Sequence, residues 1–447
     1  MKYSVVTFGC RVNQADSLSV EEGFRAHGAV AAEPHEADIV VVNTCSVTAS
    51  ADQAARQTIR RIARINPAAR IVVTGCYATR RPDEVADLPG VMRIIPNDDK
   101  SQTIPLILRD LQRGVRLQPD LTTSDRFGDG EGSCGAALEP GVAGRTAFTL
   151  RVQTGCAEQC SYCIIPTTRG RPRSVPIADV LAETERVAAA GFKEIALTGV
   201  HLGSYGRDLS PASSLFELLS AFGRGRSSDR PEPSDRADGG VLFRISSLEP
   251  MDCTPEIVNL VATAGCFAPH FHLPLQHASN RMLAAMRRPY TIEYYSALVD
   301  AIRVRIPHAS IGSDIIVGFP GETDDDFAEL SSYLASSPLT HVHVFPYSDR
   351  PGTDASIRGD KVHGAVVRER ARSIREIGQR LTAAFRASQV GTVHRGLTLE
   401  DGSLVVTGNY LKVRIPPGRV RNEWVNVKIT AANGAVMVGE LSKRVVA

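Results

Sequence analysis

The chain is long enough for several domains and is close to neutral overall. It has 447 residues, of which 43% are hydrophobic and 22% are charged, and its 51 Lys and Arg stand against 49 Asp and Glu. These values exclude a single small binding module, a disordered or fibrous chain and a general polycation. No window approaches the ~18 uninterrupted apolar residues of a membrane span, and no secretory leader is visible. We therefore expect a cytoplasmic protein of enzyme size, with no contact to a membrane.

The first hundred residues alternate short apolar runs with amphipathic stretches. Four runs rich in Val and Ile predict buried strands, namely YSVVTF, DIVVVN, RIVVTG and VMRIIP. Amphipathic stretches predict helices at 13–27, 52–65, 82–88 and 101–113. This βα alternation predicts a parallel α/β sheet with right-handed crossovers in a domain spanning 1–113. A Gly- and Asp-rich linker is expected at 114–141.

A second βα series is predicted within 142–373. Its six expected strands are FTLRVQ, EIALTG, LFRISSL, HFHLPLQ, IGSDIIVG and HVHVFPY, with helices such as PIADVLAETERVAAAG and TDDDFAELSSYLASS between them. Six such units predict a partial (β/α)6 barrel, whose chemistry collects at the carboxyl ends of the strands. The segment 223–240 has low complexity and is expected to be a disordered surface insertion.

The remaining segment, 374–447, is predicted to hold the end of a connecting helix and a small antiparallel β-barrel. An Arg-rich helix is expected at roughly 364–388, and beyond it apolar and polar residues alternate between turns. Residues 391–447 carry eight Lys and Arg and four Asp and Glu, a net charge of +4. A basic barrel of this size favours contact with RNA, with Tyr410 and Trp424 as candidates for base stacking. The alternative is a solvated surface with core aromatics.

Nine cysteines stand at spacings that no disulfide framework requires, which in a reducing compartment favours metal binding. Cys156, Cys160 and Cys163, here called the loop triad, form C-x3-C-x2-C directly after a predicted strand. A structural zinc site needs four closed ligands, and neither a fourth Cys nor a His lies within several residues. Three thiolates instead suit a [4Fe-4S] cluster with one iron left open for a substrate or cofactor.

Three further cysteines are spread over the first domain. Cys10, Cys45 and Cys76, here called the sheet triad, each follow the end of a predicted parallel strand, and such ends share one edge of a sheet. We expect these thiols to gather there, the alternative being three unrelated buried cysteines. The other three are expected to be a free thiol in the linker and two small core residues: Cys134, Cys253 and Cys266.

These motifs resemble those of known families. The loop triad, with Tyr162 before its last Cys, resembles the radical S-adenosylmethionine enzymes. The segments VTFGCRVNQADS, VVNTCSVTASADQAARQ and VVTGCYA resemble the N-terminal domain of the methylthiotransferases. The branch that modifies threonylcarbamoyladenosine in tRNA has segments similar to CSYCIIPTTRGRPRS, LTGVHLGSYGRDL, SSLEP, DIIVGFPGET and VHVFPYSDRPGT. The C-terminal barrel then corresponds to a TRAM domain, a small RNA-binding fold.

The resemblance implies two [4Fe-4S] clusters and S-adenosylmethionine as cofactors. The loop triad would hold the cluster that binds and cleaves S-adenosylmethionine, and the sheet triad would hold a second cluster that supplies sulfur. Both triads are therefore the implied metal ligands and catalytic residues. The implied cofactor contacts are Tyr162 at the adenine, Thr198 and Gly199 at the methionine end, Ser246 and Glu249 at the ribose, and Gly318 and Gly321 at the adenine. Each glycine could instead serve only as a turn.

The implied reaction adds a methylthio group to C2 of N6-threonylcarbamoyladenosine beside the anticodon. An unactivated C–H bond on adenine is too strong for acid–base chemistry, so a radical from the cofactor must open it. The implied partners are the tRNA anticodon stem-loop and an electron donor such as flavodoxin or ferredoxin, and we expect a monomer. The RNA contacts expected in the barrel are Arg395, Lys412, Arg414 and Lys428. Arginines at helical spacing form either a solvated face or a grip on the anticodon stem: Arg56, Arg60, Arg61 and Arg64.

Other functions stay open at this point. Sister enzymes act on isopentenyladenosine in tRNA or on an aspartate of a ribosomal protein, and the basic barrel favours RNA over protein. A different class would be a non-catalytic iron–sulfur RNA-binding protein that senses redox state, which the motifs at the strand ends disfavour. One departure from the family pattern is visible, because His277, Ala278 and Ser279 stand where Ser-Gly-Ser is expected. The loop follows the fourth predicted strand, so we expect this substitution to alter a contact in the active site.

Overall fold

The computed structural model describes residues 1–113, 146–224, 240–432 and 434–442. The chain divides into two compact units. The first consists of Met1–Leu138, Arg151–Glu183 and Ser348–Ser356, and the second of Glu139–Leu150, Thr184–Tyr347 and Ile357–Ala447. The predictions for the linker at 114–141, for Cys134 and for most of the insertion at 223–240 fall outside the described residues.

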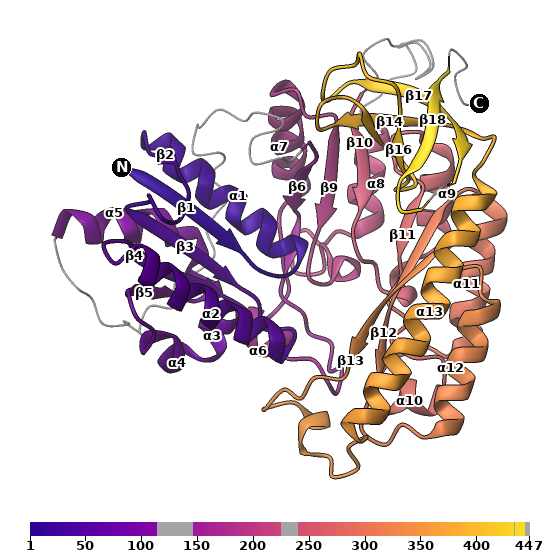
Figure 1. Cartoon of the computed structure of the whole chain (residues 1–447), viewed down its shortest axis with the longest axis horizontal. Coiled ribbons are helices and arrows are strands. Elements are labelled where there is room, and N and C mark those ends of the chain that lie inside the picture. Colours follow the sequence, from indigo (N-terminus) through magenta and orange to yellow (C-terminus); the bar gives the residue numbers. More distant parts are fainter. Residues whose placement is uncertain (114–145, 225–239, 433, 443–447) are drawn as a thin grey trace. The chain divides into compact units, whose positions relative to one another are not determined.

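The N-terminal sheet of the first unit confirms the predicted parallel α/β fold (Figure 1). Its strands lie in the order β2-β1-β3-β4-β5, and every neighbouring pair runs parallel. Their bounds are β1 Lys2–Thr7, β2 Val30–Ala31, β3 Ile39–Thr44, β4 Arg70–Gly75 and β5 Val91–Ile95. The chain leaves β1 toward β2 on one side and returns to β3 on the other. The carboxyl ends of β1 and β3 therefore form a switch point, where ligands bind in sheets of this kind.

Helices cover both faces of this sheet. They are α1 Arg11–Ala26, α2 Ala49–Ile65, α3 Cys76–Arg80, α4 Pro82–Ala86 and α5 Thr103–Arg113, with a 3-10 turn at Asn97–Gln102. Val40 of β3 packs with Ile59 of α2 on one face. The next residue, Val41, packs on the other face with Phe24 of α1, because successive strand residues point to opposite sides. Burial on both faces explains why these strands are nearly continuous apolar runs.

The second unit contains two three-stranded sheets in the order β6-β9-β10 and β11-β12-β13, and the pairs β9-β10, β11-β12 and β12-β13 run parallel. The strands are β6 Phe148–Arg151, β9 Glu194–Thr198, β10 Leu242–Ile245, β11 His270–His272, β12 Ser310–Val317 and β13 His341–Pro346. An isolated bridge between Phe243 and Phe267 joins the two sheets. Six strands in this order form the predicted partial barrel, which is open between β6 and β13.

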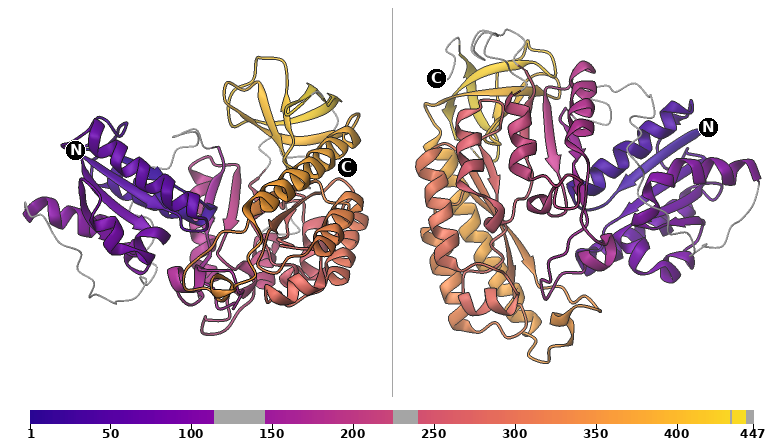
Figure 2. Two further views of the ribbon diagram at one scale, coloured as in Figure 1. Left: turned by 60° about the horizontal axis from the view of Figure 1, so that its bottom comes forward. Right: turned by 180° about the vertical axis from the view of Figure 1, so that it is seen from behind.

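The outer layer of this barrel consists of helices that follow the strands in the chain (Figure 2). Those within the second unit are α8 Leu215–Arg224, α9 Pro255–Thr263, α10 Asn280–Ala285, α11 Ile292–Arg305, α12 Asp324–Ser336 and α13 Gly364–Ser388, while α7 Ile177–Ala189 is divided between the two units. Thr323 and Asp326 form a capping box that fixes the start of α12. Gly378 lets α13 lie directly on β13, since an added Cβ would stand 2.7 Å from a methyl group of Val342.

The C-terminal segment forms the predicted small closed barrel, with one difference in strand direction. Its strands are β14 Val393–Leu399, β15 Leu404–Thr407, β16 Lys412–Arg414, β17 Trp424–Ala431 and β18 Met437–Leu441, in the order β14-β15-β16-β18-β17. All neighbours are antiparallel except β16 and β18, which run parallel because β18 closes the barrel beside a strand of the same direction. Val405, Val427 and Ile429 fill its interior. Within the described residues, no helix has the length and apolarity needed to cross a membrane.

Candidate active site

The structure gathers the sheet triad at the carboxyl edge of the N-terminal sheet. Cys10 is the N-cap of α1, Cys45 directly follows β3, and Cys76 is the first residue of α3 after β4. The pKa of the Cys45 thiol is raised to about 11, mainly because the thiol is buried. A hydrogen bond from the Val47 backbone N–H lowers this pKa, and the nearby Cys10 and Cys76 raise it. Because β1, β3 and β4 are neighbours in the sheet and run parallel, the three cysteines at their carboxyl ends lie at one edge. Cys45 and Cys76 are buried and Cys10 is exposed.

Two glycines let the backbone wrap closely around these thiols. Gly9 and Gly75 have φ angles of 86° and 96°, which favour glycine. A Cβ on Gly9 would lie 2.5 Å from the Sγ of Cys45, and one on Gly75 would lie 2.2 Å from the carbonyl oxygen of Thr44. Both positions therefore require glycine, because a neighbouring segment of the chain passes too close for a side chain. Gly9 directly precedes Cys10, and Gly75 directly precedes Cys76.

Gly75→Ala is expected to destabilise the N-terminal sheet by about 2–4 kcal/mol, because backbone strain at positive φ adds to a clash with Thr44. Hydrogen exchange of the β3 and β4 amides measures this local stability. Gly28→Ala is the matched control, since Gly28 also has a positive φ of 73° but has no atom within 4 Å of an added Cβ. It should cost only about 1 kcal/mol. Equal losses in the two variants would show that the close approach at Gly75 is unimportant.

The loop triad lies in a segment pinned by backbone contacts. It follows β7 (Gln153–Thr154) and precedes α6 (Ile165–Arg169) and β8 (Arg173–Ser174), which pairs with β7. The N–H of Cys156 donates to the carbonyl oxygen of Gly170 at 3.0 Å. Gly155 has a φ of 76°, and a Cβ there would lie 1.9 Å from the carbonyl oxygen of Arg171. All three thiols and Tyr162 are partly accessible, as a site that receives a cofactor requires.

A buried ionic network connects the two triad-bearing segments within the first unit. The Asp16 carboxylate lies 2.6 Å from Lys100 Nζ and 3.3 Å from Arg169 Nη2, and it also pairs with Arg151. These interactions lower the pKa of Asp16 even though burial alone would raise it, so the carboxylate is ionised. This network was not predicted from the sequence. Asp16 and Arg169 lie in VTFGCRVNQADS and CSYCIIPTTRGRPRS, the motifs that carry the two triads, and this is the signal that was available.

Asn97 provides a more direct connection between these segments. Its side-chain amide donates to the carbonyl oxygen of Thr168 at 2.7 Å and lies 3.6 Å from the Sγ of Cys76. A hydrogen bond to a ligand thiolate is one means by which a protein tunes an iron–sulfur cluster. Asn97 was not predicted as a site residue, because it follows β5 without any motif around it.

Another buried ion cluster anchors Ser348–Ser356 to the N-terminal domain within the first unit. Asp52 of α2 pairs with Arg80 at 2.5 Å and with Arg350 at 2.8 Å, and all three side chains are almost fully buried. Arg350 belongs to the motif VHVFPYSDRPGT, where its role was not predicted. The cluster explains why a segment that follows the last barrel strand in sequence packs with the first unit.

The remaining predicted cofactor contacts lie at strand ends of the second unit. Thr198 ends β9 and is followed by Gly199, while Ser246 directly follows β10. Thr198 and Ser246 are buried, and the Ser246 hydroxyl has no hydrogen-bond partner among the described residues. Because a buried hydroxyl without a partner is costly, a polar ligand at this strand end would satisfy it.

Three other predicted contacts already have partners in the chain. Glu249 forms an ion pair with the buried Arg288. The N–H of Gly318 donates to the Glu322 carboxylate at 2.7 Å, and the N–H of Gly321 donates to a backbone carbonyl at 2.8 Å. A backbone contact from either glycine to an adenine would therefore have to use an atom other than its N–H.

The departure at His277 is a change in the core of the second unit. The side chain of His277 is fully buried, its Nδ1 accepts from the N–H of Ser279 at 3.0 Å, and its Nε2 lies 3.6 Å from the Glu322 carboxylate. Glu322 in turn pairs with Arg370 of α13. The substituted residue thus packs against an internal ion pair.

Two cysteines outside the triads are core residues, as expected. Cys253 and Cys266 are buried at either side of α9. Burial raises the pKa of the Cys253 thiol to about 12, so it stays protonated near neutral pH.

The predicted RNA contacts lie on the C-terminal barrel. Lys412 and Arg414 are exposed on β16, and Lys428 on β17 is also exposed and lies 3.9 Å from Glu440. The guanidinium of Arg395 lies 4.2 Å from the centre of the Trp424 ring. Among its described residues, the barrel thus presents exposed cations on β16 and β17 and a cation–aromatic pair of Arg395 with Trp424.

Two of the other RNA candidates make contacts inside the chain. The Tyr410 ring lies 3.8 Å from the guanidinium of Arg244 and packs edge-on against His270. On α2, Arg56 donates to the Tyr77 hydroxyl at 3.0 Å. The other arginines of that helix are exposed, and they are Arg60, Arg61 and Arg64.

Comparison with known proteins assigns the family. Residues 2–96 match Uncharacterized protein family UPF0004, and residues 150–334 match the Radical SAM superfamily. The threonylcarbamoyladenosine tRNA methylthiotransferase MtaB of Aquifex aeolicus is 35% identical over 416 residues, which are 93% of this chain and 96% of that protein. The chain belongs to the radical S-adenosylmethionine methylthiotransferase family. The cofactors of this radical S-adenosylmethionine family are S-adenosylmethionine and [4Fe-4S] clusters, as the sequence predicted.

Other methylthiotransferases are similar at nearly the same level. A tRNA-2-methylthio-N(6)-dimethylallyladenosine synthase of Mycobacterium marinum is 30% identical, over 98% of this chain and 82% of that protein. The ribosomal protein uS12 methylthiotransferase RimO of Acidothermus cellulolyticus is 33% identical, over 87% of this chain and 82% of that protein. Identity alone therefore leaves the substrate within the methylthiotransferase family open.

The fold is also shared with solved structures. The radical S-adenosylmethionine methyltransferase TsrM from Kitasatospora setae, solved with cobalamin and a [4Fe-4S] cluster, aligns with a TM-score of 0.56 at 18% identity. The alignment covers 80% of this chain and 74% of that chain. This likeness supports the architecture of the methylthiotransferase chain and carries no inference about its substrate.

Proposed function

We propose that this methylthiotransferase adds a methylthio group to C2 of N6-threonylcarbamoyladenosine beside the anticodon of tRNA. The observation that carries the proposal is the gathering of Cys10, Cys45 and Cys76 at one sheet edge, in a chain that also carries the loop triad. The similarity to the Aquifex aeolicus enzyme favours threonylcarbamoyladenosine over the other substrates. We further propose a cytoplasmic monomer that takes electrons from a flavodoxin or ferredoxin.

The side chains present fit two iron–sulfur clusters. Each triad offers three soft sulfur donors, the ligand type that iron–sulfur clusters select, and glycines beside them keep the backbone close. When bound, the loop-triad cluster would supply the electron that splits S-adenosylmethionine into a radical, and the sheet-triad cluster would supply sulfur. The interactions of Asp16 with Arg169 and of Asn97 with Thr168 hold together the two segments that bear these cysteines. The role of this network is to fix one triad relative to the other within the first unit.

Other residues would orient S-adenosylmethionine and RNA. Tyr162 would lie against the adenine, and the unpartnered hydroxyl of Ser246 would bind a polar group of the cofactor. Thr198, Gly199, Glu249, Gly318 and Gly321 are the other proposed cofactor contacts. Cations on the C-terminal barrel would hold phosphates of the tRNA, and they are Arg395, Lys412, Arg414 and Lys428.

The proposal is tested with the full-length chain after anaerobic reconstitution with iron and sulfide. The chain is incubated with S-adenosylmethionine, a reductant and an anticodon stem-loop that carries either threonylcarbamoyladenosine or isopentenyladenosine. Mass spectrometry of the nucleosides should show methylthiolation of the first RNA only. Modification of the second RNA alone would assign the sister activity. Cleavage of S-adenosylmethionine with neither RNA modified would favour the ribosomal-protein aspartate, and binding of RNA with no cleavage at all would favour a redox sensor.

Lys412→Ala combined with Arg414→Ala is expected to weaken tRNA binding and to lower the slope of log affinity against log salt by roughly 2, because each phosphate contact contributes about one unit. Filter binding across a salt series measures both quantities. The charge-matched control replaces Arg70 and Arg109, two exposed cations of the N-terminal domain, by alanine. The same slope in both double variants would remove the C-terminal barrel from the RNA-binding surface.

A further inference from the structure

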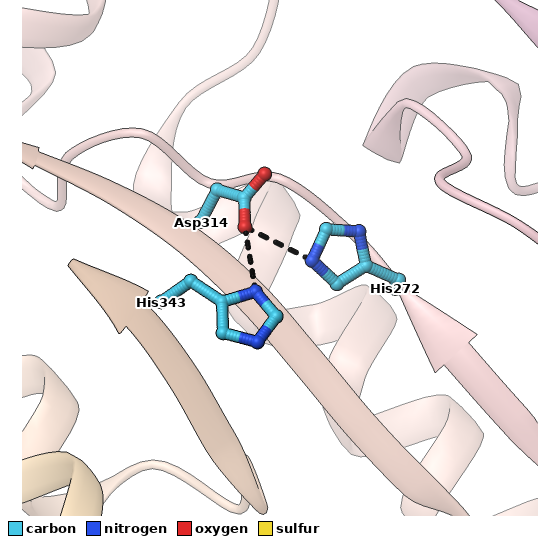
Figure 3. Close-up of side chains that lie close together, drawn as sticks. All are labelled: His272, Asp314 and His343. Carbon is cyan, nitrogen blue, oxygen red and sulfur yellow. Dashed lines mark hydrogen bonds and ion pairs between the residues drawn. The ribbon is translucent and has the colours of Figure 1, made fainter. Parts of the chain in front are cut away.

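Three side chains from adjacent strands of the second unit, none of them a cysteine, converge on one another (Figure 3). Oδ1 of Asp314 lies 3.0 Å from Nε2 of His272 and 3.1 Å from Nδ1 of His343. One ligand atom from each of the three residues lies within 4.8 Å of the other two. Both imidazoles thus point a nitrogen at the same carboxylate oxygen.

The convergence follows from strand register. Asp314 on β12 is the register partner of His343 on β13, and His272 on β11 is the partner of Gly312, two residues before Asp314. Residues two apart in a strand share a face, so the three functional side chains emerge on one side of the sheet. The same face at Gly312 is occupied by the ring of His341, because a Cβ on Gly312 would lie 2.1 Å from that ring. A residue with a side chain would therefore not fit at position 312.

We propose that His272, Asp314 and His343 bind a divalent first-row transition-metal ion. Two imidazoles and one carboxylate are a donor set that Zn²⁺ and Fe²⁺ both accept. Donors at 2.0–2.1 Å from a tetrahedral ion stand about 3.3 Å apart, so the two oxygen-to-nitrogen separations need almost no adjustment. On binding, the ion would replace the protons that these hydrogen bonds now share.

The surroundings of the three residues suit an ion that exchanges with solvent. Nδ1 of His272 lies 2.8 Å from Oγ of Ser247, a contact that fixes the ring with Nε2 directed at Asp314. The side chain of His343 is 58% exposed and that of Asp314 is 26% exposed, which gives an ion a route to its ligands. Three protein ligands leave at least one position for water or for an oxygen atom of a substrate.

The test uses Zn²⁺ with the anaerobically reconstituted full-length chain, so that clusters occupy the cysteines. After gel filtration, elemental analysis should find about one zinc per chain, and X-ray absorption should show only nitrogen and oxygen neighbours at about 2.0 Å. Asp314→Asn and His343→Ala should each lose this zinc while keeping the wild-type iron content. Ser247→Ala should weaken zinc binding about 10- to 100-fold.

His35→Ala is the matched control, because His35 is exposed in the first unit and lies far from the site in sequence. It should retain the zinc of the wild type. His343→Ala keeps the test valid if Asp314→Asn fails to fold, since His343 is the most exposed of the three. Three results would overturn the proposal: no retained zinc, equal zinc in all variants, or sulfur neighbours at about 2.3 Å.

Discussion

Cys160→Ala is expected to abolish both S-adenosylmethionine cleavage and methylthio transfer, whereas Cys10→Ala is expected to abolish only the transfer. The loop triad is the proposed site of cofactor cleavage, so the loss of one of its thiols stops the first step and everything that follows. The sheet triad is the proposed source of sulfur, and its loss should leave the radical chemistry in place. The two variants therefore separate the two proposed clusters by function.

Two products are measured for each variant, 5′-deoxyadenosine for cleavage and the methylthiolated nucleoside for transfer. The wild type should bind about eight irons per chain, and each variant should bind about four. Cys253→Ala is the control, because Cys253 is a buried cysteine outside both triads and should keep all the iron and both products. Equal loss of the two products in Cys10→Ala and Cys160→Ala would refute the division of roles.

Asp16→Ala is expected to destabilise the first unit by about 3–5 kcal/mol, because it leaves Lys100 and Arg169 buried without their anion. The ion pairs of Asp16 do not themselves contribute this much to the free energy of unfolding. The cost arises because the charges of Lys100 and Arg169 stay buried without compensation. Since Asp16 contacts both triad-bearing segments, the loss should also reduce the iron content after reconstitution.

Hydrogen exchange of the β1 and β3 amides provides the stability measurement. Asp87→Ala is the control, because Asp87 is an exposed carboxylate of the same domain and should change the stability by no more than about 0.5 kcal/mol. A cost below about 1 kcal/mol for Asp16→Ala would show that the network is hydrated or replaceable.

The strands and helices were largely predictable from the sequence, for a physical reason that differs between the domains. RIVVTG matches β4 because a strand buried on both faces is a continuous apolar run, whereas the Arg-rich helix matches α13 because its apolar residues recur with the helical period. The parallel pairing of β16 and β18 was not predictable, because barrel closure sets it and local alternation does not. The predicted small antiparallel barrel is confirmed, and the pair that closes it runs parallel.

The part of the candidate site that the sequence could predict is the two cysteine triads, because their spacing and their positions after strands are visible in the sequence. Both triads follow from cysteines placed after strands, and parallel topology brings such ends to one edge. The partners of Asp16 come from positions 84 to 153 residues away, so no local pattern indicates them. A signal for the histidine site was present, since a charged residue at Asp314 is unusual in a buried parallel strand. It was missed because its partners come from two other strands.

The most direct test of the proposed function compares tRNA nucleosides, by mass spectrometry, from a strain that lacks this gene and from its parent. In the deletion strain we expect 2-methylthio-N6-threonylcarbamoyladenosine to disappear and N6-threonylcarbamoyladenosine without the methylthio group to accumulate. The wild-type gene should return both nucleosides to their parental levels, and a gene that carries Cys10→Ala should not. An unchanged level of the methylthiolated nucleoside in the deletion strain would contradict the proposed function.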